Sequence, residues 1–101
     1  QGPARAALLS PLIPLPEGVE ALRLAFRTAS RAQKGLRYAA RVVFLRADGS
    51  QILDDRHDYK TTGFQAYTAR VPSGATALRV RFAFDLPAAF ALIEPTLTPI
   101  R

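Results

Sequence analysis

Apolar and polar residues alternate along residues 63–84, and this pattern is the clearest structural signal in the chain. Tyr67 and Val71 alternate with polar or small neighbours, a Pro-Ser-Gly break follows at residues 72–74, and a second alternating run contains Val80 and Phe82. A period of two places one set of side chains on the buried face of a strand and the other set in water. The segment therefore predicts two half-buried β-strands joined by one turn.

The same alternation recurs elsewhere and predicts the remaining elements. We expect an edge strand at the proline-rich opening, three further strands, and a closing strand over residues 6–13, 21–28, 36–45, 51–54 and 90–97. Asp48-Gly49 is a hairpin signal, because this pair tolerates the positive φ of tight turns. Seven short strands and no convincing helix predict an all-β fold, a two-sheet antiparallel β-sandwich of the jelly-roll type.

Two segments are expected to lie outside the strands. Residues 54–62, with the sequence DDRHDYKTT, are the most polar stretch, and we expect them to form a long loop of the kind that often binds ligands. Residues 87–90 allow a short helical turn that would leave the fold class unchanged.

Length and composition indicate one globular domain. The chain has 101 residues, with 49% apolar and 22% charged, and its apolar runs are shorter than the roughly 20 residues that a membrane span requires, so we expect no membrane insertion. Residues 1–3, Gln-Gly-Pro, match the end of an engineered protease recognition site. We interpret them as a cloning scar and expect a single β-sandwich domain over residues 4–101.

The charge is strongly biased toward arginine. The net charge is +6, and 12 of the 14 basic residues are arginine. A GC-rich bacterial genome would produce this preference, and guanidinium groups also suit the paired oxygens of carboxylates, phosphates and sulfates. Nucleic acid is a weaker ligand candidate, because no recognised motif is present and aromatic residues do not interleave with the basic ones.

Six arginines fall on the strand phase opposite the bulky apolar residues. They are Arg23, Arg27, Arg37, Arg41, Arg79 and Arg81. If their strands share one sheet, they form one basic surface that attracts a polyanion with salt-dependent affinity. The alternative is that they only keep the outer faces soluble and are divided between two sheets.

Familiar catalytic and metal-binding motifs are absent from the sequence. There is no cysteine and one histidine, His57, so we expect no zinc site and no cofactor. Asp54, Asp55 and Asp58 are typical of surface turns, and no serine lies in a G-x-S-x-G context. On these grounds the sequence predicts that the domain is not an enzyme.

Four segments together resemble a known family. The succession LRLAFRT, RYAARVVFLRADGSQI, YKTTGFQAYTARVPSGATALRVRFAF and ALIEPTLTPI is similar to the galactose-binding-like jelly rolls that serve bacterial proteins as carbohydrate-binding modules. The likeness spans about residues 8–100 and is strongest at residues 71–75. Ile93-Glu94-Pro95 replaces the acidic pair that lies beside a structural calcium in many members, so we expect no metal here.

The resemblance implies a sugar ligand, and the polar segment contains the candidate residues. Tyr59 is the best candidate for stacking on a sugar ring, and its charged or polar neighbours Arg56, His57, Asp58 and Lys60 would bond the hydroxyls. Tyr38 and Tyr67 lie in strands, and we expect them in or at the edge of the core, with hydroxyls that reach backbone partners.

We therefore expect a non-catalytic accessory module that binds glycan, including acidic polysaccharide, in a bacterial envelope or secreted protein, and hence an extracytoplasmic location. The alternative is a structural or protein-interaction domain that packs against a neighbouring domain and binds no sugar. An exposed hydrophobic patch over residues 6–15 would favour that alternative. An aromatic-floored cleft beside residues 56–60 would favour sugar.

Overall fold

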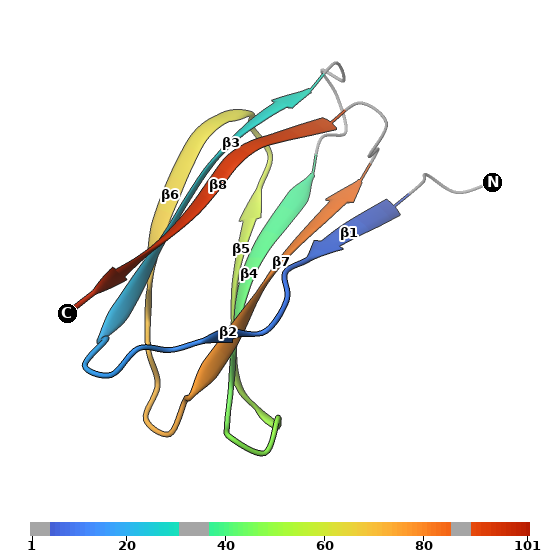
Figure 1. Cartoon of the computed structure of the whole chain (residues 1–101). Helices are drawn as coiled ribbons and strands as arrows, with labels where there is room; N and C mark the ends of the chain where they lie inside the picture. Colours follow the sequence, from blue (N-terminus) through green and yellow to red (C-terminus); the bar gives the residue numbers. More distant parts are fainter. Residues whose placement is uncertain (1–4, 31–36, 86–89) are drawn as a thin grey trace.

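The protein is a sandwich of two antiparallel β-sheets (Figure 1). The computed structural model describes residues 5–30, 37–85 and 90–101. Sheet A has the order β1-β7-β4-β5, with β2 also paired to β7, and sheet B has the order β6-β3-β8. The strands of sheet A are β1 (Arg5–Leu9), β2 (Ile13–Pro14), β4 (Tyr38–Leu45), β5 (Gln51–Tyr59) and β7 (Ala77–Asp85). Those of sheet B are β3 (Ala21–Ser30), β6 (Gly63–Arg70) and β8 (Phe90–Ile100).

This architecture confirms the predicted all-β, two-sheet antiparallel sandwich. The predicted opening strand is present as β1 and β2, which both pair with β7. The interpretation of residues 1–3 as a scar falls on residues outside the described ones, as does the suggested helical turn except for Phe90, which begins β8. In the described part of the chain no helix is present that could span a bilayer.

The prediction of a long polar loop over residues 54–62 is wrong. Strand β5 continues to Tyr59, and each of its residues from Asp54 onward has a partner in β4. The physical reason is that β5 is the edge strand of sheet A, where one phase of charged side chains can stay in water. Because both phases of this segment contain polar residues, the sequence shows no alternation of apolar and polar positions there.

The two tight turns form as predicted. Gly49 has φ 88° and donates its N–H to the Arg46 carbonyl at 2.9 Å, while Asp48 accepts bonds from the Ser50 hydroxyl and N–H. These bonds, led by the hydroxyl, lower the pKa of Asp48 below its ordinary value. Gly74, with φ 87°, provides the corresponding positive φ in the turn before β7.

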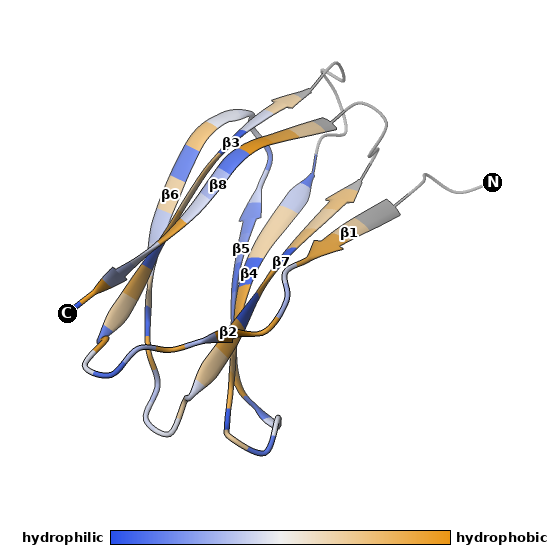
Figure 2. Cartoon of the chain, in the orientation of Figure 1, coloured by the Kyte–Doolittle hydropathy of each residue, from blue (hydrophilic) through white to orange (hydrophobic). Residues whose placement is uncertain are grey.

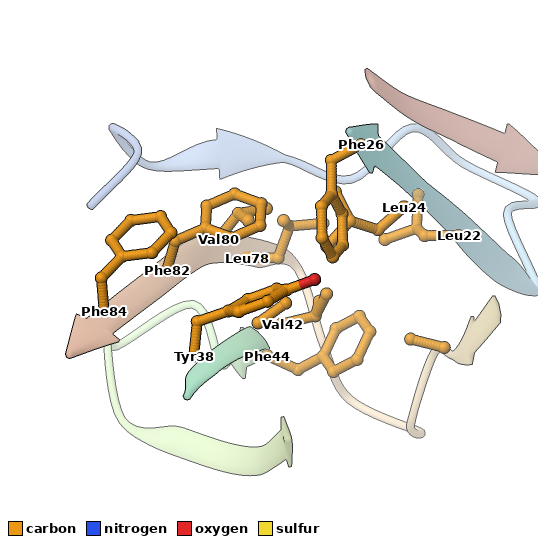
Figure 3. Packing of buried hydrophobic residues seen from close by; sticks show 12 residues of the cluster. Leu22, Leu24, Phe26, Tyr38, Val42, Phe44, Leu78, Val80, Phe82 and Phe84 are labelled. Atoms are coloured by element: carbon orange, nitrogen blue, oxygen red, sulfur yellow. The ribbon is translucent and has the colours of Figure 1, made fainter. Parts of the chain in front are cut away.

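The core lies between the sheets and is centred on Phe26 (Figure 3). The Phe26 ring from sheet B meets Phe82, Tyr59 and Tyr38 of sheet A edge-on, with centroid distances of 5.1, 5.6 and 6.3 Å. Edge-to-face contacts are a favoured arrangement of aromatic rings. The apolar phases of β3, β4 and β7 are therefore inward, as the alternation predicts.

Tyr38 links the two sheets through its hydroxyl. This oxygen donates to the Thr61 carbonyl at 2.7 Å and lies 3.1 Å from the Thr28 hydroxyl in β3. Tyr38 is 3% exposed, so the prediction of a core tyrosine with a backbone partner is confirmed. A buried hydroxyl needs such partners because an unsatisfied one destabilises the fold.

Hydrophilic and hydrophobic residues alternate along several strands (Figure 2), as expected where one phase faces the core and the other faces water. The condition for a single basic surface of six arginines is not met, because β3 pairs with β6 and β8 and not with β4 or β7. The arginines are divided between two sheets, as the alternative stated. Arg23 and Arg27 lie on sheet B, whereas the rest belong to the sheet A side, namely Arg37, Arg41, Arg79 and Arg81.

Apolar residues at the opening remain exposed. Leu8, Leu9 and Leu12 have 53%, 60% and 53% of their surface accessible. Leu8 pairs with the buried Phe82 and so points to the inner side, yet the three strands of sheet B do not cover it. Leu9 pairs with the outward Arg81, so Leu8 and Leu9 lie on opposite sides of β1 and the exposed leucines do not share one face.

Candidate functional site

A hollow of about 620 Å³ lies on sheet A, and three alanines form its floor. Ala83 of β7 pairs with Ala7 of β1 on one side and with Ala39 of β4 on the other. The three methyl groups are therefore adjacent on the outer phase of three neighbouring strands. Longer side chains on both sides leave a depression above them, which we call the sheet A hollow.

Basic side chains surround this floor. Four cations and one carboxylate line the sheet A hollow: Arg37, Arg56, Lys60, Arg81 and Asp58. The formal charge of this lining is +4 − 1 = +3. Such an excess in a concave surface raises the local concentration of anions.

Three arginines lie in register across the sheet beside the hollow. Arg41 of β4 pairs with Arg81 of β7 and with Arg56 of β5. Neighbouring strands are about 4.8 Å apart, so the outer two Cα atoms are roughly 10 Å apart. Like charges at directly opposite positions destabilise a sheet. An anion lying across the row would relieve this repulsion.

The central arginine is only partly neutralised. The Nε atom of Arg41 lies 3.6 Å from the Oδ2 atom of Asp54, which makes an ion pair but is longer than a hydrogen bond. Within the described residues, Arg41 Nε and Asp54 Oδ1 are buried and have no hydrogen-bond partner. The unpartnered Nε atom is buried, so this donor is not open to a ligand, and Arg41 contributes to the row mainly through its charge.

Arg56 and Asp58 form a close pair at the edge of the sheet. The Nε and Nη2 atoms of Arg56 lie 3.0 and 2.9 Å from the same Asp58 oxygen. Both side chains are at least half exposed, so the pair contributes little to stability. It holds one guanidinium of the row in a defined direction beside the hollow.

The five candidate residues of the polar segment do not share one face, because β5 is a strand. Arg56, Asp58 and Lys60 line the sheet A hollow, whereas His57 and Tyr59 lie on the opposite, inner phase. Successive side chains of a strand point to opposite sides. The sequence prediction grouped all five residues in one loop and did not anticipate this division; their role in binding stays a prediction.

Tyr59 packs chiefly against the core. Its ring stacks on Tyr38 with a centroid distance of 5.1 Å and meets Phe26 edge-on at 5.6 Å. Burial raises the pKa of the Tyr59 hydroxyl, and the neighbouring Tyr38 and Asp55 raise it further. Tyr59 and Tyr38 also border the hollow, but their rings point inward to the core, so the aromatic-floored cleft that would favour sugar is not present at this site.

His57 belongs to a cluster on the inner side of the sheet edges. Its Nε2 atom lies 3.2 Å from the Oδ1 atom of Asp55, and its ring stacks on Tyr67 of β6 at 3.7 Å. The Tyr67 hydroxyl is buried without a hydrogen-bond partner in the described part of the chain, and its pKa is raised, first by burial and then by Asp55. Tyr67 thus lies at the core edge, as predicted, but its hydroxyl does not reach the backbone partner that we expected.

The described residues offer no observation in favour of a metal or cofactor site. Among residues 5–30, 37–85 and 90–101, no group of three or more His, Cys, Asp or Glu side chains could hold a metal ion. The sheet A hollow offers donors to an anion and supplies few ligands to a cation.

The alanine floor was not identified from the sequence. Ala7, Ala39 and Ala83 carry no chemistry of their own, and small residues on an outer strand phase usually have no significance. The detectable signal was the position of Ala39 and Ala83 two residues from Arg41 and Arg81 on the same phase. Only the strand register shows that they meet.

No protein-family model matches the chain, and no curated protein matches it. Among solved structures, the chain is similar to the crystal structure of the enzymatically active domain of tailspike protein 4 from bacteriophage CBA120. The TM-score is 0.73 and the identity 19%, over 95% of this chain and 14% of that one. This likeness establishes a shared fold.

That comparison corrects the prediction that the domain is not an enzyme. The matched structure is described as an enzymatically active domain, which contradicts the prediction. The prediction depended on missing sequence motifs, and motifs do not detect catalytic groups that only folding brings together. The match confirms the β-sandwich without singling out the galactose-binding-like modules that the sequence resembles.

Proposed function

We propose that this domain recognises an acidic polysaccharide, of the uronate-containing or phosphorylated class, through the sheet A hollow. The row of Arg81, Arg41 and Arg56 beside an alanine floor is the observation that carries the proposal. Guanidinium groups bind the paired oxygens of carboxylates and phosphates bidentately. The alanine floor leaves room for sugar rings between these charges.

The shape of the site favours a polymer over a small anion. The arginine row crosses three strands, so it presents charges over roughly 10 Å, more than one carboxylate can span. A glycan lying across the strands would place successive acidic groups along the row. Its hydroxyls would meet Asp58 and Lys60 at the edge of the hollow.

The proposed setting is a polysaccharide-handling protein of a bacterial envelope or of secreted material, outside the cytoplasm. The family resemblance of the sequence supports this setting, and so does the likeness to a tailspike domain. The basic lining is consistent with it, since surface glycans that carry acidic groups would be attracted over a Debye length of about 8–10 Å.

The first experiment is a binding titration with polygalacturonate, with neutral dextran as the comparison polymer, at low and moderate salt. We expect salt-sensitive binding to polygalacturonate only. Arg81→Gln should weaken it about tenfold or more, because one charge-assisted contact is lost.

Arg23→Gln is the matched control, because it removes the same charge from an exposed arginine on the other sheet. The proposal requires Arg23→Gln to bind nearly as the unaltered domain does. Equal losses in the two variants would show that net charge alone drives binding and would reject the sheet A hollow as the site.

A second candidate function is supported by the exposed opening strand. Leu8, Leu9 and Leu12 leave apolar surface exposed on both sides of the edge of sheet A, and a neighbouring domain packed against this edge would cover it. On this hypothesis the domain is a structural or protein-interaction unit of a longer protein and binds no glycan.

The triple variant Leu8→Ser, Leu9→Ser and Leu12→Ser tests this second function. If this edge is an interface, the unaltered domain should associate at high concentration and the variant should remain monomeric in light scattering. Polygalacturonate binding that survives in the variant would separate the two functions.

A further inference from the structure

A second hollow, of about 390 Å³, lies on the opposite side of the molecule, on sheet B. Its lining is Ala25, Phe26, Arg27, Phe64, Ile93, Glu94 and Thr96. We call it the sheet B hollow. Its small floor residue is Ala25, on the outer phase of β3, and larger side chains border it.

An exposed aromatic ring borders this hollow. Phe64 is 57% exposed, whereas Phe26, Phe44, Phe82 and Phe84 are each at most 6% exposed. Burying a phenylalanine stabilises a fold by about 1.5–3 kcal/mol, so leaving one in water forgoes that gain. The register places Phe64 and Ile93 on either side of Arg27, in one row across β6, β3 and β8.

A strained bulge brings polar groups to the same place. Between Ala25 and Arg27 the pairing of β3 with β8 shifts, so that Glu94 and Pro95 together lie opposite Phe26. Glu94 has φ 47°, in the left-handed region that is unfavourable for a residue with a side chain. Bulges often redirect side chains beside functional sites. Here the bulge brings Glu94 into the lining beside Thr96, whose hydroxyl donates to the Ala25 carbonyl at 3.4 Å.

We propose that the sheet B hollow is a second binding site, which holds one neutral sugar ring against Phe64. A pyranose has an apolar face of C–H groups and a rim of hydroxyls. Phe64 and Ile93 offer apolar contact, Arg27 donates and Glu94 accepts hydrogen bonds. Ligand pockets typically combine such apolar walls with a few polar groups, at volumes from about 300 Å³.

Charge distinguishes this site from the sheet A hollow. Its lining has one cation, Arg27, and one carboxylate, Glu94, so the formal charge is zero. A carboxylate ligand would gain from Arg27 and be repelled by Glu94. The site therefore selects an uncharged sugar, and its affinity should change little with salt.

The surrounding face is unlike a protein interface. Next to the Phe64 row come a row of Ala66, Ala25 and Thr96 and a row of Thr68, Arg23 and Thr98. Interface centres are depleted in charge, and a stable one covers about 800 Å² on each partner. Two apolar side chains beside an arginine do not provide such a centre, whereas they suffice for one ring.

The test is a titration of the 15N-labelled domain with cellohexaose, xylohexaose and mannohexaose, followed by amide chemical shifts. We expect at least one sugar to shift the amides of Ala25, Arg27, Phe64 and Thr96. Phe64→Ala should weaken that binding about tenfold, equivalent to about 1.4 kcal/mol. Phe64→Trp should preserve or strengthen it, because the larger ring offers more contact.

Ile100→Ala is the matched control, since Ile100 is exposed on the same face at the far end of β8. Its binding should be unchanged. The proposal is overturned if no sugar shifts these amides, if Phe64→Ala binds equally well, or if the shifts follow protein concentration alone, which indicates self-association. Arg81→Gln should leave neutral-sugar binding intact, so this proposal and the acidic-polysaccharide proposal can fail separately.

Discussion

The two outer faces of this sandwich contain arginines from the same sequence pattern, yet their surroundings differ. On sheet A, Arg41 has an arginine opposite it in both neighbouring strands, whereas on sheet B Arg27 lies between Phe64 and Ile93. The first arrangement accumulates charge, and the second surrounds one charge with apolar surface. Strand register, which sequence alternation does not specify, thus decides what an outward arginine can bind.

The shared core gives the strongest way to disturb both faces together. Phe26→Ala removes the ring that contacts Phe82, Tyr59 and Tyr38 from across the sandwich. We expect a loss of about 3–5 kcal/mol in the free energy of unfolding, measured by urea denaturation. Both hollows should lose their ligands at a lower denaturant concentration. A loss below about 1 kcal/mol would contradict this central role.

A smaller effect is expected at Tyr67, which lines neither hollow and lies on the inner side of β6. Its unpartnered, buried hydroxyl predicts that Tyr67→Phe raises stability at neutral pH by about 1 kcal/mol. The raised pKa also predicts that the unaltered domain loses stability as pH rises above about 10, where the unfolded tyrosine ionises first.

Thermal unfolding between pH 7 and 11 measures this effect. The alkaline loss should be smaller in Tyr67→Phe than in the unaltered domain. Identical pH profiles would show that Tyr67 does not control the alkaline loss. Neither ligand should bind differently, because the substitution lies between the faces.

The arginine row permits a sharper comparison of the faces themselves. Arg41 has like charges opposite it on both sides, so Arg81→Gln should raise stability by about 0.2–1 kcal/mol at low salt. Arg23 has Thr68 and Thr98 opposite it, so Arg23→Gln should change the stability less. Urea denaturation at low and high salt measures both. A gain that persists at high salt would argue against charge repulsion as its cause.

The smallest expected effect is at the Asp48 turn, away from both hollows. The bonds to Ser50 lower the pKa of Asp48. The stability that ionised Asp48 adds to the fold is therefore present above the ordinary carboxyl pKa and is lost as pH falls through the lowered value. Asp48→Ala should remove a slight acid dependence of stability between about pH 5 and 2. A marked change in ligand binding would contradict its remoteness.

The sequence predicts the fold well because burial imposes a period of two on strands such as β4 and β7. It fails at β5, where Asp55, His57 and Tyr59 are polar or amphipathic residues on the inner phase of an edge strand. Such a strand lacks the apolar contrast on which alternation depends. The same segment was singled out as a candidate site from its composition alone, and that assignment stays a prediction.

The candidate sites themselves were only partly predictable. Arg37, Arg56 and Arg81 were identified by residue type, but their meeting with Ala39 depends on pairings between strands distant in sequence. The exposure of Phe64 follows from its pairing with the outward Arg27, and sequence alternation alone does not specify that pairing. Glu94 acquires significance only through its backbone angle.

The placement of the end strands has a mechanical consequence. β1 begins opposite the end of β7, and β8 finishes opposite the start of β3, so these two points lie at opposite ends of the sandwich (Figure 1). A force pulling them apart acts along both strands, while the ladder hydrogen bonds run perpendicular to it. The bonds are loaded together in shear and cannot be opened one by one. Tension on the chain would therefore meet its greatest resistance along the axis on which β1 and β8 lie.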